Sequence, residues 1–129
     1  MQRNKPFEFG GRTIEPGTRA TVDLDIARLY THNDMTLPVQ VVNGRRAGPV
    51  MFVSAAVHGD EINGVEIIRR LLAHKSLHEL RGTLLAIPLA NPYGFIHRSR
   101  YLPDRRDLNR AFPGSLKGSL AGRLAYHFM

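Results

Sequence analysis

The sequence predicts an α/β fold, because two uninterrupted apolar runs frame a segment with helical periodicity. Residues 50–57 and 84–89 are nearly continuous apolar runs, which is typical of strands that are covered on both faces of a sheet. Between them, apolar side chains recur at helical spacing from Ile62 to Leu72. We therefore expect a buried central strand, a helix that packs on the sheet, and a second buried strand.

The residues before the first apolar run predict an arm followed by two strands. Residues 1–17 are interrupted by Pro6, by two adjacent glycines and by a Pro-Gly pair, which predicts a loosely held arm. Residues 19–29 and 37–42 alternate partly between apolar and polar side chains, and Asn43 with Gly44 turns the chain after the second run. We expect these two runs to form antiparallel strands at an edge of the sheet.

The last nine residues, 121–129, have the pattern of an amphipathic helix, and neither glycine nor proline follows to end it. A chain of 129 residues with 43% hydrophobic content can build one core, but it is short for a two-layer hydrolase. We therefore interpret residues 1–129 as a single incomplete domain, cut inside a helix.

Composition excludes several classes of protein. No apolar run reaches eighteen residues and no secretory leader follows Met1, so we expect neither a membrane span nor export. The absence of cysteine excludes disulfides and thiolate ligands and fits a cytoplasmic protein. The net charge of +7 permits nucleic-acid binding, but the basic residues are spread along the chain without interleaved aromatic residues. We therefore expect no nucleic-acid partner.

A candidate metal pair directly follows the first apolar run. His58 and Glu61 lie three residues apart, at the junction between the predicted strand and the predicted helix. One imidazole nitrogen and one carboxylate can then reach the same point, and zinc accepts both ligand types. The alternative is a helix N-terminus at which Asp60 and Glu61 complement the helix dipole and His58 is an ordinary loop residue.

A polar loop follows the second apolar run. It begins with Asn91, Pro92 and Gly94. It continues with residues suited to binding carboxylates, namely Arg98, Arg100, Arg105, Arg106, Asp107, Asn109 and Arg110. The guanidinium fork binds a carboxylate through two parallel hydrogen bonds, and asparagine adds a neutral donor and acceptor. A solvated basic loop is the alternative. Since both polar groups follow strand ends, we expect them at one edge of the sheet, where ligands bind in open α/β folds.

The remaining histidines are weaker candidates. His74 and His78 are four residues apart in a polar stretch, and we expect them, like His32 and His97, to be surface or loop residues. His97 is close enough in sequence to the arginine loop to line a pocket. His127 lies in the last predicted helix, with no strand leading into it.

These motifs together resemble the succinylglutamate desuccinylase/aspartoacylase family, which is related to the zinc carboxypeptidases. The matching blocks are the segments 58–61, 91–94, 100–101 and 107–114, in the family's order. The resemblance implies a mixed, mostly parallel sheet with flanking helices, to which residues 18–129 contribute the N-terminal part. It also implies zinc bound by His58 and Glu61, with Arg100 polarising the scissile carbonyl. It further implies that Asn109 and Arg110 hold the substrate carboxylate and that Asp107 orients the arginine loop.

The sequence departs from this family at the third zinc ligand. The resemblance calls for a histidine on a later strand and a general-base glutamate, and we expect both to lie beyond residue 129. We therefore predict that the chain is part of a zinc-dependent hydrolase that deacylates a small N-acyl amino acid or related carboxylate, at an amide or ester bond. The fragment itself is expected to be inactive. The alternatives are a metallocarboxypeptidase and a catalytically dead ligand-binding module.

Overall fold

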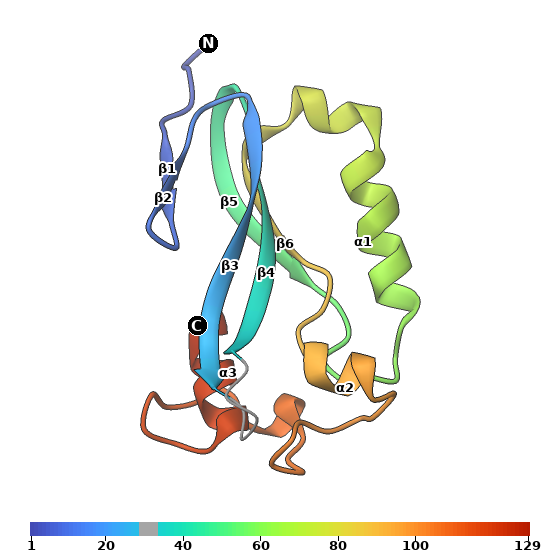
Figure 1. Ribbon diagram of the computed structural model, residues 1–129. Coiled ribbons are helices and arrows are strands. Elements are labelled where there is room, and N and C mark those ends of the chain that lie inside the picture. The colour runs from blue at the N-terminus through green and yellow to red at the C-terminus, as the bar shows by residue number, and fades with distance from the viewer. Residues whose placement is uncertain (29–33) are drawn as a thin grey trace.

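The computed structural model describes residues 1–28 and 34–129, and its main feature is a four-stranded mixed sheet (Figure 1). The strands are β3 (Thr18–Arg28), β4 (Asp34–Asn43), β5 (Arg46–Ser54) and β6 (Arg81–Ile87), in the order β3-β4-β6-β5. The pairings β3–β4 and β4–β6 are antiparallel, and the pairing β5–β6 is parallel. The predicted α/β class with antiparallel N-terminal strands is confirmed.

The antiparallel pair β3–β4 follows the alternation in the sequence. Val22 pairs with Val39 and Leu24 pairs with Leu37, and the side chains of Val22, Leu37 and Val39 are buried. The predicted first strand extended to residue 29, which lies outside the described residues, as does His32. In the described sheet β3 is an edge strand, while β4 is internal.

The N-terminal residues are more ordered than the loose arm we expected. Strands β1 (Phe7–Phe9) and β2 (Arg12–Ile14) form a two-stranded antiparallel hairpin, and Ile14 is buried in the core. The buried amide of Asn43 donates hydrogen bonds to the carbonyl oxygens of Lys5 and Ile14, at 3.0 and 2.8 Å. Gly10 and Gly11 therefore form the turn of a hairpin that is attached to the sheet, and Pro16 with Gly17 forms the turn that leads into β3.

Strand β5 is not covered on both faces within the described chain. Val50, Met51 and Phe52 are 57%, 58% and 54% exposed. β5 lies at the edge of the sheet, where it pairs with β6 and is bridged by Arg3 at its first residue, Arg46. The prediction of a buried central strand was therefore wrong for the described residues. An apolar run indicates what a strand prefers to contact, but it does not supply the covering element.

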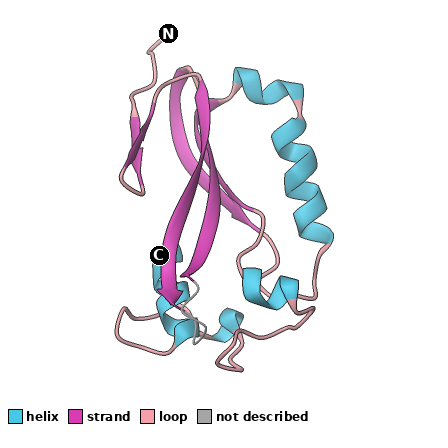
Figure 2. Cartoon of the chain, viewed as in Figure 1, coloured by secondary structure: helices cyan, strands magenta, loops and turns pink. Residues whose placement is uncertain are grey.

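The helices lie mainly at one side and one end of this sheet (Figure 2). Helix α1 (Asn63–Ala73) and the 3-10 helix η1 (Lys75–Glu79) connect β5 to β6, and α1 contacts β5. Ile68 is the buried residue of α1, whereas Ile67 is 66% exposed. Past β6 come helix α2 (Pro92–Ile96), 3-10 helix η2 (Leu108–Arg110) and helix α3 (Leu120–Phe128). No helix among the described residues is long and apolar enough to cross a bilayer.

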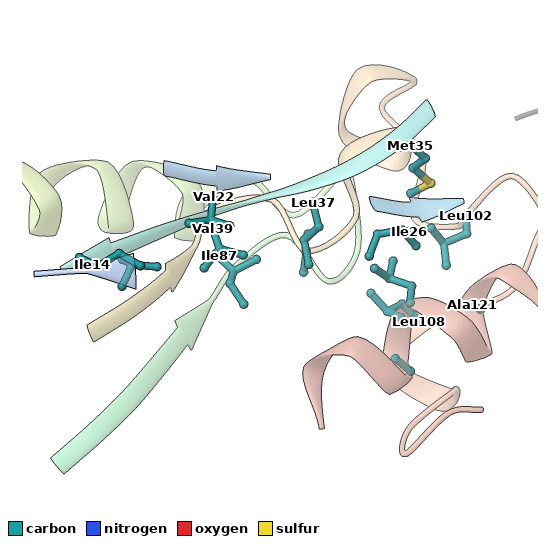
Figure 3. Packing of buried hydrophobic residues seen from close by; sticks show 14 residues of the cluster. Ile14, Val22, Ile26, Met35, Leu37, Val39, Ile87, Leu102, Leu108 and Ala121 are labelled. Carbon is teal, nitrogen blue, oxygen red and sulfur yellow. The ribbon is translucent and has the colours of Figure 1, made fainter. Parts of the chain in front are cut away.

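The hydrophobic core holds the polar loop in place. In Figure 3, Leu102 and Leu108 lie near Ile26 of β3, beside Ala121 of α3. Leu102 and Leu108 are 2% and 0% exposed, so the loop between α2 and η2 is fixed by two buried leucines. Asp107 directly precedes the second of them, which sets its position relative to the sheet.

Candidate metal and substrate site

The loops that follow β5 and β6 continue to pair after the strands end. The backbone N–H groups of Ala90 and Asn91 donate to the carbonyl oxygens of Ala55 and Ala56, at 2.8 and 3.0 Å. This pairing brings the segment that begins with His58 beside the segment that begins with Asn91. The two polar clusters that the sequence places after separate strands therefore share one edge of the sheet, as expected from parallel strands.

Two glycines allow these loops to touch. A Cβ atom at Gly59 would collide with the backbone of Gly94 and with the nitrogen of Phe95. Gly94 is in turn held by Asn91, whose Oδ1 accepts the Gly94 N–H at 2.9 Å and so caps α2. Asn91 is fully buried, and its Nδ2 has no hydrogen-bond partner in the described structure. Backbone contact at Gly59 therefore ties the His58 turn to α2.

The backbone enters this turn in a strained conformation. Ala56 has a φ of 54°, in the left-handed region that residues other than glycine seldom adopt, and its side chain is buried. The strain lies two residues before His58. The cost of this strain is offset by the hydrogen bond that the Ala56 carbonyl oxygen accepts from the backbone N–H of Asn91.

His58 is the centre of the site, because each ring nitrogen faces a different carboxylate. Its Nδ1 lies 3.1 Å from Glu61 Oε2, and its Nε2 lies 2.8 Å from Asp107 Oδ1. The side chains of His58 and Asp107 are 10% and 12% exposed, whereas that of Glu61 is 64% exposed. The carboxylate of Asp107 thus holds the buried side of the imidazole, while Nδ1 faces the open side with Glu61.

Asp107 remains ionised in this environment. Burial acts to raise the pKa of its carboxyl group, but hydrogen bonds from His58 and from the Asn109 backbone N–H lower it, and the charges of His58 and Arg100 add to this effect. The net result is a pKa below the ordinary value. The Asn109 N–H donates to Oδ1 at 2.9 Å, and this contact also caps η2. One carboxylate therefore fixes both the His58 ring and the start of η2.

The two predicted substrate arginines lie on the solvent side of these carboxylates. Arg100 Nη1 is 3.5 Å from Glu61 Oε1, and Arg100 Nη2 is 3.6 Å from Asp107 Oδ2. Arg110 Nε is 3.9 Å from Asp107 Oδ2, and its side chain is 83% exposed. Asn109 is also exposed. The structure thus brings five of the six predicted site side chains into one network, and Asn109 joins it through its backbone.

The other histidines that the structure describes do not join this network. The ring of His97 lies against that of Tyr93, with centroids 4.3 Å apart and planes tilted by 41°, and His127 is exposed on α3 beside Tyr126. Across residues 1–28 and 34–129, no group of three histidine or carboxylate side chains is arranged to hold a metal. The described residues therefore supply a pair of candidate ligands, His58 and Glu61.

The sequence reasoning missed the contact between His58 and Asp107. These residues are 49 positions apart, and the spacing of neither motif indicates that they meet. It likewise missed the contact of Gly59 with Gly94, although a glycine in each of two loops that follow adjacent strands was a usable signal.

The geometry of His58 and Glu61 fits zinc. Two ligands bound at about 2.0–2.1 Å in a tetrahedral arrangement lie roughly 3.3 Å apart. His58 Nδ1 and Glu61 Oε2 lie 3.1 Å apart. A carboxylate behind the distal ring nitrogen, here Asp107, is also the usual companion of a metal-binding histidine. The ligand types and the separation of His58 and Glu61 are therefore those expected of two of the ligands in a zinc site.

Comparison with known proteins identifies the family. Residues 47–129 match the model of the succinylglutamate desuccinylase/aspartoacylase catalytic domain. The chain belongs to this family. It is 31% identical to N-alpha-acetyl-L-2,4-diaminobutyric acid deacetylase of Halomonas elongata over 93 residues, which are 71% of this chain and 27% of that enzyme. It is 40% identical to succinylglutamate desuccinylase of Burkholderia thailandensis over 84 residues, which are 63% of this chain and 23% of that enzyme.

A solved structure supports the same assignment. The crystal structure of a succinylglutamate desuccinylase/aspartoacylase from Rhodobacter sphaeroides superposes with a TM-score of 0.76 at 26% identity, covering 85% of this chain and 35% of that one. The chain therefore spans about a quarter to a third of the length of these relatives. Enzymes of this succinylglutamate desuccinylase/aspartoacylase family are deacylases that act on N-acyl amino acids.

Proposed function

We propose that residues 18–129 form the N-terminal part of a zinc-dependent deacylase domain, and that they contribute two zinc ligands and the substrate-binding arginines. The observation that carries this proposal is the position of His58, with Asp107 at its buried nitrogen and Glu61 at its open nitrogen. A basic loop without a metal role has no need of such a pair. The third ligand and the general base are expected outside the described residues.

In this mechanism His58 Nδ1 and Glu61 would hold the metal. Asp107 accepts the Nε2 proton of His58, which leaves the lone pair of Nδ1 free to bind it. Bound zinc would supply Lewis-acid polarisation of the scissile carbonyl and activation of a water. Because Asp107 is ionised, it keeps the His58 ring in this tautomer.

The arginines would bind and stabilise the substrate. Arg100 lies within 3.6 Å of both carboxylates, so its guanidinium is placed beside the metal pair, where charge on the carbonyl oxygen develops. Arg110, which is largely exposed, would bind the carboxylate of the substrate together with Asn109. The names of the two enzyme relatives describe removal of an acyl group from an amino acid, which supports a small N-acyl amino acid as the substrate class.

Zinc content tests the metal assignment. Elemental analysis would compare this chain with a version extended to the length of its relatives, each with and without His58→Ala. Stoichiometric zinc that depends on His58 in the extended version is the expected result. Absence of zinc from both versions would contradict the proposal and favour a binding module.

Activity of the extended version tests the role of Arg100. Arg100→Ala should lower kcat/KM on an N-acyl amino acid, because one oxyanion donor is lost. The expected loss corresponds to about 2–4 kcal/mol of transition-state stabilisation. Arg98→Ala removes the same charge from an exposed loop position and serves as the matched control. An unchanged kcat/KM for Arg100→Ala would exclude this role.

A further inference from the structure

A cavity of about 520 Å³ lies at the opposite end of the sheet from His58. It is lined by the start of β3, the end of β4, the turn at residues 44–45, and the end of α1 with η1. Figure 1 shows that this end of α1 is separated from α2 by the length of the helix. The volume is in the range of pockets that bind small molecules.

The lining of this cavity is basic. It includes Arg19, Arg45, His74 and His78, and no aspartate or glutamate is among the lining residues. No ion pair joins Arg19 or Arg45 to an acidic residue in the described part of the chain. The guanidinium groups of Arg19 and Arg45 present only donors, and no carboxylate lines the cavity, so an anion is the ligand class that complements them.

The two arginines are positioned by specific contacts. Arg19 Nη2 donates to the carbonyl oxygen of Leu72 at 2.8 Å, which places the guanidinium at the end of α1. The Nε and Nη1 atoms of Arg19 take no part in this bond. The stem of Arg45 lies over Gly17, where a Cβ atom would be 2.8 Å from Arg45 Cγ and 3.0 Å from its Nε. The missing side chain at Gly17 thus provides the space that Arg45 occupies at the cavity wall.

The imidazole of His74 presents a donor. Its Nδ1 accepts the Ser76 backbone N–H at 3.3 Å and lies 2.6 Å from Ser76 Oγ. Since Nδ1 is an acceptor, the proton of the neutral ring is on Nε2, which is then free to donate to a ligand. The contact with Ser76 also fixes the orientation of the ring at the start of η1.

One residue of the cavity lining, Asn43, is fixed by hydrogen bonds. Asn43, which is 1% exposed, accepts hydrogen bonds from Asn4 and Thr83 and donates to Lys5 and Ile14. Both polar atoms of its side chain therefore have partners within the fold, which fixes the position of Asn43 in the cavity wall.

We propose that this cavity is a second binding site, for a small anion that carries phosphate or carboxylate groups. Arg45 and the Nε2–H of His74 would bind the anion directly, with Arg19 and His78 at its sides. The site is independent of the zinc ligands and of the proposed deacylase activity.

Calorimetric titration of the chain with inorganic phosphate, and separately with succinate, tests this site. Arg45→Gln should weaken binding at least tenfold, because it removes the charged fork at the wall. Arg46→Gln is the matched control, since Arg46 is the next residue, is exposed and does not line the cavity. It should change the Kd by less than twofold. Binding of phosphate alone identifies a phosphate-bearing ligand, and binding of succinate alone identifies a carboxylate ligand.

NMR signals of the histidine rings locate the bound anion. Those of His74 and His78 should shift as the probe saturates, and Arg45→Gln should abolish these shifts. His78→Gln, at an exposed position of η1, is a second variant and should also weaken binding. The proposal is overturned if neither probe saturates, if Arg45→Gln and Arg46→Gln weaken binding equally, or if the His74 and His78 signals do not shift. Circular dichroism would confirm that each variant is folded.

Discussion

The contact between His58 and Asp107 predicts how strongly a residue outside the metal pair controls zinc affinity. Asp107→Asn keeps the size of the side chain but removes the charge that faces His58 Nε2 at 2.8 Å. The amide can also present its NH₂ group to Nε2, which would move the ring proton to Nδ1 and block the ligand atom.

The expected loss is 10- to 100-fold in zinc affinity, the usual range for the carboxylate partner of a ligating histidine. The upper part of this range applies, because the His58 and Asp107 side chains are only 10% and 12% exposed and water cannot easily replace the lost contact. Titration with zinc against a chromophoric chelator measures the ratio of the zinc affinities of the parent chain and of Asp107→Asn. This ratio can be measured even for the weak binding expected of His58 and Glu61 alone.

Two variants make this measurement specific. His58→Ala identifies the part of the zinc binding that belongs to this site. Asp60→Asn removes a negative charge from an exposed residue in the same turn and should leave the zinc affinity within about twofold. If Asp107→Asn behaved like Asp60→Asn while His58→Ala abolished binding, the reasoning that Asp107 holds the ligand tautomer would be refuted.

Three further predictions concern stability. Gly59→Ala should destabilise the fold by about 1–3 kcal/mol in urea unfolding, because the new Cβ collides with the backbone of Gly94, whereas Gly118→Ala, with contacts no closer than 3.5 Å, should cost far less. Ala56→Gly should be tolerated better than Ala86→Gly, since only Ala56 has a positive φ that glycine relieves, and equal losses in unfolding free energy would contradict this. Hydrogen bonds from Arg69 and Arg70 lower the pKa of Glu66 from 4.5 to about 2, so its contribution to stability is complete above pH 4.5 and lost as the pH falls towards 2. Acid titration of Glu66→Gln should lack this loss, and a curve identical to that of the parent chain would count against the pairing.

Local patterns predicted the parts of the fold that depend on local chemistry. The alternation in β3 and β4 and the helical spacing in α1 were sufficient to predict those elements. The hairpin β1–β2 was missed, because three-residue strands carry too little periodicity to stand out among glycines and prolines. The covering of β5 was predicted wrongly, because it depends on which other segments reach the sheet.

The candidate site divides in the same way. His58 and Glu61 are three residues apart, so their spacing alone predicted that they can meet. Asp107 reaches His58 only because Leu102 and Leu108 anchor the loop in the core and because the loops after β5 and β6 pair through Ala90 and Asn91. Such long-range placement depends on packing between segments, which no single motif contains.

The exposure of the site residues separates two kinds of role. The side chains of His58 and Asp107 are nearly buried and lie 2.8 Å apart. Glu61 and Arg110, at 64% and 83% exposure, are free to adjust to what binds. A preformed pair lowers the entropic cost of binding, whereas exposed side chains lose rotamer freedom when a ligand fixes them. Substitution of Asp107 should therefore act first on metal affinity, and substitution of Arg110 should act first on the KM for the substrate.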